Sequence, residues 1–222
     1  MSFLSPDSAF MRSLSTIVDA IVITVMMAIS SIPIITIGAA ASAGHDAIRR
    51  SLIGQGHLVR NYWRAFRGNF VKATILWLFF AGVLLLEVYA LFFLTASPML
   101  IPKFAVAIIW VIGFEWVWAF QARFDNTVGR TLINAYVVGV SHIGATVVMV
   151  AIDAAYVAIV IGSWKYMPGG LFLLGLLGYG MLILLHTPFI EKVFRPYVSR
   201  HDGPEDSGSA LAAERDSQVS PS

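Results

Sequence analysis

The chain has 222 residues, of which 58% are hydrophobic and only 13% are charged. Soluble domains carry about 25% charged residues, so this composition excludes an ordinary soluble domain and favours a membrane protein. The formal net charge of +2 does not suggest a nucleic-acid partner, and the lack of cysteine excludes disulfides, thiolate nucleophiles and sulfur-ligated metals.

Five apolar stretches approach or exceed the roughly 20 residues that a helix needs to cross a bilayer. Helices are expected because a lipid-exposed backbone must satisfy its own hydrogen bonds, and the runs lack the alternating polarity of barrel strands. The predicted fold class is therefore an all-α polytopic membrane protein with about five transmembrane helices and cytoplasmic interfacial amphipathic helices. The expected spans cover residues 14–35, 73–96, 104–121, 143–162 and 171–190.

The first span ends in SIPIITIGAAASAGHDAIRR, which allows two interpretations. A signal-peptide exit could use Ala41-Ser42-Ala43 as its cleavage site, but the apolar core exceeds the usual 7–15 residues. A bend motif fits better. Pro33 cannot donate a backbone hydrogen bond, Thr36 can cap a second helix, and Gly38 begins a run of small residues that allows close packing.

The next segment, LVRNYWRAFRGNFVK, has the pattern of a basic amphipathic helix. Arg60, Arg64 and Arg67 fall on one face, and an apolar, largely aromatic face lies opposite. Such helices usually lie in the membrane interface against anionic headgroups. A membrane-proximal helix packed under the bundle is the alternative, and both descriptions can hold together. The apolar face comprises Leu58, Tyr62, Ala65, Phe66 and Phe70.

Between the third and fourth spans, we expect a cytoplasmic helix from about Thr127 and a new span beginning near His142. In this span Ala154, Ala158 and Gly162 recur every four residues, which predicts a packing face and a central place in the bundle. Near the end, the chain becomes polar and loses periodicity. We therefore divide it into a membrane helical domain, 1–198, and a disordered cytoplasmic tail, 199–222.

Lysine and arginine predict the orientation. With five spans, twelve of the fifteen basic residues fall on one side, which we take as cytoplasmic. The N-terminus is then outside and the C-terminus cytoplasmic. The twelve are Arg49, Arg50, Arg60, Arg64, Arg67, Lys72, Arg123, Arg130, Lys192, Arg195, Arg200 and Arg215.

Four acids lie inside predicted spans: Asp19, Glu87, Glu115 and Asp153. An ionisable residue costs about 2.5–3.5 kcal/mol at a span centre on insertion scales, so each is a candidate site. The functional interpretation is a cluster that binds a proton or cation. The structural interpretation, which we favour, is four separate carboxyl groups, each hydrogen-bonded to a neighbour.

The five histidines do not have the spacing of HExxH or another metal-binding motif, so we interpret them as ordinary interfacial residues. No P-loop, dinucleotide fingerprint or nucleophile elbow is present. The sequence therefore predicts no catalytic residue, no metal ligand and no cofactor, and we expect a protein that is not an enzyme.

Several segments together resemble the YesL-like family of bacterial integral membrane proteins, which carry a domain of unknown function. They are IPIITIGAAASA, YWRAFRGNFVKATIL, FQARFDNTVGRTLINAYVVGVSHIGAT and TPFIEKVFRPY. The resemblance covers roughly residues 10–197 and implies a multi-pass protein of the bacterial cytoplasmic membrane. It also suggests an accessory or regulatory partner of a carbohydrate uptake system, in contact with a membrane transport complex. The alternative is a small transporter or channel that uses Asp153, Glu115 and Glu87.

Overall fold

The computed structural model describes residues 9–93 and 100–201, which form helices joined by short connections. The chain divides into two compact units, of which the first ends at Thr187. Within the described residues there is no strand. The helices are α1 (Ala9–Ser30), η1 (Ile34–Thr36), α2 (Ile37–Leu52), α3 (Leu58–Phe93), α4 (Leu100–Arg123), α5 (Val128–Ser141), α6 (Ile143–Tyr166) and α7 (Gly170–His201).

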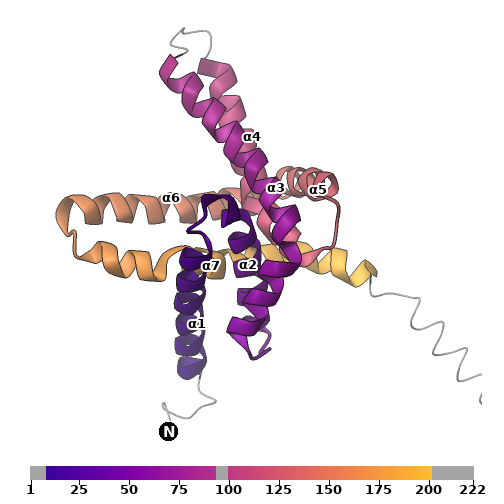
Figure 1. Ribbon diagram of the computed structural model, residues 1–222, viewed down its shortest axis with the longest axis vertical. Coiled ribbons are helices and arrows are strands. Elements are labelled where there is room, and N and C mark those ends of the chain that lie inside the picture. The colour runs from indigo at the N-terminus through magenta and orange to yellow at the C-terminus, as the bar shows by residue number, and fades with distance from the viewer. Residues whose placement is uncertain (1–8, 94–99, 202–222) are drawn as a thin grey trace, which may run out of the picture. The chain divides into compact units, whose positions relative to one another are not determined.

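Five of these helices, α1, α3, α4, α6 and α7, are long and apolar enough to cross a membrane. This confirms the predicted all-α polytopic membrane protein. The described part of each expected span lies largely within one of these helices; residues 94–96 of the second lie outside the described residues. α3 and α4 lie side by side, as Figure 1 shows.

α3 differs from the prediction because the expected basic interfacial helix and the second span form one continuous helix of 36 residues. The sequence contains no proline between Leu58 and Phe93 to interrupt it. The glycines Gly68 and Gly82 cost only about 1 kcal/mol each in a helix, so they do not end it. The predicted amphipathic pattern is present, since Tyr62 and Ala65 are buried.

The predicted bend between α1 and α2 is present. Pro33 is extended, with φ −75° and ψ 107°, and precedes the short η1 turn. Thr36 is the N-cap residue of α2, but its side chain makes no capping hydrogen bond. Its hydroxyl instead donates to the carbonyl oxygens of Ser30 at 2.5 Å and Pro33 at 2.6 Å. The hydroxyl is drawn to these carbonyls because the end of a helix leaves carbonyl groups without intrahelical partners.

α2 is the buried centre of the first unit, and every residue from Gly38 to Ile48 is buried. It packs against α1, α3 and α4. A Cβ atom at Gly38 would lie 2.6 Å from Trp77 Cβ, and one at Gly44 would lie 2.6 Å from Met27 Sδ. The small residues therefore let neighbouring helices approach α2 closely, as their pattern predicted.

α2 runs back along α1, because Ser51 near the end of α2 donates a hydrogen bond to Asp19 in α1. The connection after α2 therefore lies beside the N-terminal half of α1. The predicted orientation, with the N-terminus outside and the C-terminus cytoplasmic, stays a prediction.

α6 does not have the central place predicted for the fourth span. Its buried residues are Thr146 and Met149, both in its first half. Ala154 and Ala158 of the expected packing face are exposed, and Gly162 is only half-buried. The prediction was wrong because the close packing that small residues permit takes place around α2.

α5 and α6 begin as predicted. Thr127 is the N-cap of α5, and its side chain accepts a hydrogen bond from the backbone N–H of Arg130. α6 starts at Ile143, directly after His142. α7 continues to His201, beyond the predicted start of the tail at residue 199, and residues 202–222 of that tail lie outside the described residues.

Candidate metal centre

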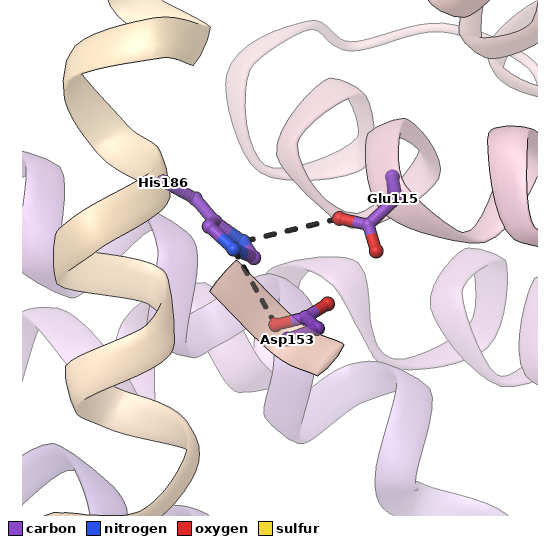
Figure 2. A group of neighbouring side chains, drawn as sticks. All are labelled: Glu115, Asp153 and His186. Atoms are coloured by element: carbon purple, nitrogen blue, oxygen red, sulfur yellow. Dashed lines mark ion pairs between the residues drawn. The ribbon is translucent and has the colours of Figure 1, made fainter. Parts of the chain in front are cut away.

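Three ionisable side chains from three helices converge inside the first unit. Glu115 comes from α4, Asp153 from α6 and His186 from α7, and Figure 2 shows them turned toward one another. One ligand atom from each lies within 4.8 Å of the other two. His186 Nδ1 is 3.9 Å from Glu115 Oε2, and His186 Nε2 is 3.4 Å from Asp153 Oδ1. This set of donors could hold a metal ion.

The centre is largely shielded from solvent. The side chains of His186 and Glu115 are 6% and 8% exposed, whereas that of Asp153 is 31% exposed. His186 Nε2 and Asp153 Oδ1 are buried and have no hydrogen-bond partner among the described residues. A buried polar atom without a partner costs about 1–3 kcal/mol, so these two atoms call for an explanation.

Hydrogen bonds between helices fix the places of the two acids. Trp116, next to Glu115 in α4, donates its indole N–H to Thr146 Oγ1 of α6 at 2.9 Å. Thr146 in turn donates to the carbonyl oxygen of Gly139 in α5 at 2.8 Å. Asp153 lies two helical turns after Thr146, on the same face of α6, so it is directed toward α4.

α7 is interrupted at Gly178, which has φ 39° and ψ −148° and lies before His186. Only glycine adopts this backbone conformation readily. Thr24 of α1 satisfies backbone groups on both sides of the break. Its Oγ1 donates to the carbonyl oxygen of Leu177 at 2.8 Å and accepts from the N–H of Gly180 at 3.1 Å. Tyr156 of α6 adds a bond from its hydroxyl to the carbonyl oxygen of Leu174 at 2.8 Å.

Asp19 and Glu87 are not part of the centre. Asp19 accepts a hydrogen bond from Ser51, which is the role expected of a separate carboxyl group. Glu87 is half-buried on α3. The expectation of four separate carboxyl groups is therefore corrected for Glu115 and Asp153, which the structure brings together.

His186 was missed by the sequence analysis, which grouped it with ordinary interfacial histidines and predicted no metal ligand. A signal was available, because His186 lies within the expected span 171–190. An ionisable residue inside a span is a candidate site whatever its charge type. The three ligands also come from helices far apart in the sequence, so no short motif could reveal them.

The basic residues form separate features. Arg60, Arg64 and Arg67 are all exposed on α3, as the amphipathic pattern predicted. The predicted contact of these residues with anionic headgroups stays a prediction. Arg49 and Arg50 instead pair with the buried Asp46, each at 2.7 Å.

A cavity of about 440 Å³ lies near the centre and has a mostly apolar wall. Phe114, the neighbour of Glu115 in α4, lines it together with Tyr156 of α6 and Tyr179 of α7. Gly178 lines it as well, so the break in α7 opens onto this space. The three helices of the centre, α4, α6 and α7, therefore also line the cavity, together with α1, α2 and α3.

Comparison with known proteins finds a family match in the N-terminal part of the chain. Residues 20–91 match the family described as "Protein of unknown function, DUF624". The resemblance to the YesL-like family is consistent with this match. The matched region runs from α1 into α3 and ends before Glu115, Asp153 and His186. No curated protein and no solved structure matches the chain.

Proposed function

We propose that the protein is a small, non-enzymatic membrane transporter that binds a cation at Glu115, Asp153 and His186. The observation that carries the proposal is the convergence of the three side chains from three apolar helices. Ionisable residues inside membrane helices are costly, and where they occur they usually mark ion or substrate pathways.

The interruption of α7 supports the same function. Discontinuous helices near the bilayer midplane are a recurring feature of transporters, where freed backbone groups line the binding site. Here the break at Gly178 opens onto a cavity, and Thr24 satisfies the freed carbonyl and N–H groups. Because side chains of α1 and α6, rather than intrahelical bonds, hold this part of α7, the break is a place where the helix can move.

Reconstitution of the full chain into liposomes tests this function. Uptake of Na⁺, K⁺, Mn²⁺ and Zn²⁺ would be followed with trapped fluorescent indicators. We expect uptake of at least one cation, reduced about tenfold or more by Glu115→Gln and by Asp153→Asn. Glu87→Gln is the matched control, because Glu87 is also an acid in an apolar helix but lies outside the centre.

The proposal is wrong if none of these cations crosses the native liposomes faster than protein-free ones. It is equally wrong if uptake is the same in the native protein and in folded Glu115→Gln and Asp153→Asn variants. Membrane insertion and a single size-exclusion peak establish that each variant is folded.

An accessory or regulatory role beside carbohydrate uptake is the second candidate, and it follows from the family resemblance. The exposed arginines Arg60, Arg64 and Arg67 favour it, because they provide a surface for a transport complex or for anionic headgroups. Purification from a bacterial cytoplasmic membrane in mild detergent should then recover components of an uptake system. Replacement of the three arginines by glutamine should abolish this recovery. Unchanged recovery would show that the three arginines are not the surface that contacts the uptake system.

The proposed orientation places the C-terminus in the cytoplasm and the connection between α6 and α7 outside. The chain contains no cysteine, so single cysteines at Gly169 and Gly56 can be labelled without background. Labelling of Gly169→Cys in intact cells, and of Gly56→Cys only after permeabilisation, is the expected result. A tag at the N-terminus then shows whether it lies on the side of Gly56, as the α1–α2 pairing implies, or opposite it.

A further inference from the structure

We infer that the cation of the Glu115–Asp153–His186 centre is a divalent first-row transition metal of the Zn²⁺, Mn²⁺, Co²⁺ or Fe²⁺ class. The inference deepens the proposed function and rests on the same site. His186 Nε2 and one oxygen each from Glu115 and Asp153 are the assigned ligands.

The donor atoms select this class of metal. Imidazole nitrogen suits zinc, copper, iron and nickel, whereas Mg²⁺ and Ca²⁺ prefer sites built from oxygen alone. Soft ions such as Cu⁺ are selected by thiolate and thioether ligands, and the three assigned ligands include neither. Zinc accepts both histidine nitrogen and Asp or Glu oxygen as ligands, and its catalytic sites use three protein ligands, as this centre offers.

The distances fit ligands that share one metal. Two ligand atoms that each lie about 2.1 Å from a tetrahedral metal are separated by about 3.4 Å. His186 Nε2 and Asp153 Oδ1 are 3.4 Å apart, too far for a good hydrogen bond. The Glu115 ligand atom lies within 4.8 Å of the other two. Rotation of the Glu115 side chain that moves this oxygen by about an ångström would bring all three atoms to the spacing of ligands on one metal.

The Nε2 atom of His186 is also suited to a metal. It is buried, lies 3.4 Å from Asp153 Oδ1 and has no hydrogen-bond partner among the described residues. The other ring nitrogen, Nδ1, lies 3.9 Å from Glu115 Oε2. A neutral imidazole binds metals through the lone pair of one ring nitrogen, and the buried Nε2 can serve as that ligand atom.

Charge favours a divalent ion over a monovalent one. Metal ligands bind in their deprotonated form, so two carboxylates and a neutral imidazole would bring a charge of about −2 to the bound ion. A divalent metal neutralises this charge, whereas a monovalent cation leaves a net charge in a poorly hydrated place, which is costly. The partly exposed Asp153 provides the point of entry from outside the centre.

Cobalt is the probe for the test, because Co²⁺ replaces Zn²⁺ and its d–d absorption reports its ligands. The purified, detergent-solubilised full chain should bind one equivalent of Co²⁺ with the visible spectrum of a nitrogen- and oxygen-ligated ion. Zn²⁺ should displace it, whereas a hundredfold excess of Mg²⁺ or Ca²⁺ should not. The variants His186→Gln and Asp153→Asn should weaken binding by about tenfold or more, with Glu87→Gln and His57→Gln as controls.

Failure of the native protein to bind Co²⁺, displacement by Mg²⁺ or Ca²⁺, or undiminished binding by folded His186→Gln would overturn the inference. The liposome experiment separates it from the proposed function. Uptake of Na⁺ or K⁺ that depends on Glu115 and Asp153, without Co²⁺ binding, would refute the metal class and leave a transporter. Binding of Co²⁺ without any uptake would refute transport and leave a metal site.

Discussion

α2 and α6 are both rich in alanine and glycine, yet the structure uses them in opposite ways. α2 is buried from Gly38 to Ile48, whereas α6 exposes Ala154 and Ala158 along the stripe that they form with Gly162. α2 also carries charged residues that are paired within the helix, whereas the one acid of α6 lies in the candidate metal centre. Small residues alone therefore do not identify the central helix of a bundle. The comparison can be tested by changing equivalent features of the two helices.

The largest difference is expected for added volume. Gly38→Ala should lower the free energy of unfolding by about 3 kcal/mol, because its Cβ would collide with the backbone of Ala73 and with Trp77 and Trp118. Gly162→Ala in α6 should be neutral or slightly stabilising, because nothing lies within 4 Å of its added Cβ. Chemical denaturation in detergent measures both, and equal loss in the two variants would contradict the comparison.

Removal of the buried charge in α2 should have the next largest effect. The Asp46 side chain is 6% exposed and pairs with Arg49 and Arg50. Asp46→Ala should lower the free energy of unfolding by about 2 kcal/mol. This loss is smaller than that expected for a fully buried ion pair, because both arginines are partly exposed to solvent. Asp125→Asn, which changes an exposed pair with Lys72, is the control and should cause no measurable change. An equal effect of the two substitutions would show that burial does not matter here.

A pH-dependent stability should also originate in α2, which contains His45. Burial, with a smaller contribution from the neighbouring His186, lowers the pKa of His45 to about 3. An unfolded histidine takes up its proton near pH 6.5, so the unfolded state is favoured as the pH falls from about 6.5 toward 3.

Because of His45, the free energy of unfolding should fall by up to about 1.4 kcal/mol per pH unit below about pH 6, and it should be at its full value above about pH 7. Thermal unfolding between pH 8 and pH 5 measures it. His45→Gln removes the titrating group and should flatten the profile. An unchanged pH profile in that variant would assign the effect to other groups.

The smallest effect is expected on the exposed stripe of α6. Ala154→Leu and Ala158→Leu should change the free energy of unfolding in detergent by less than about 0.5 kcal/mol, because both sites face outward. A loss comparable to that of Gly38→Ala would show that the stripe is covered in the native protein. Cross-linking of Ala158→Cys to the same residue of a second copy would then show that another copy of the chain covers the stripe.

Much of the fold follows from the sequence because the signals are local. Apolar length predicts five spans, Pro33 predicts the bend, and Thr127 predicts the start of α5. The burial of α2 is not predictable in this way, since it depends on how α1, α3 and α4 surround it. The same reason applies to the metal centre. Asp153 and Glu115 can be identified one by one as acids in spans, but their meeting with His186 depends on the break in α7 and on the bonds of Thr146.

The continuity of α3 has a mechanical consequence. With 36 residues, the helix is about 54 Å long, which far exceeds a hydrocarbon core of roughly 30 Å. Such a rod behaves as a lever: a tilt of about 10° around its middle displaces each end by about 5 Å. One end carries Arg60, Arg64 and Arg67, and the opposite end carries the exposed aromatic rings of Tyr89, Phe92 and Phe93. A movement of the arginine-bearing end of α3 is therefore transmitted to the aromatic end, because the helix has no break between them.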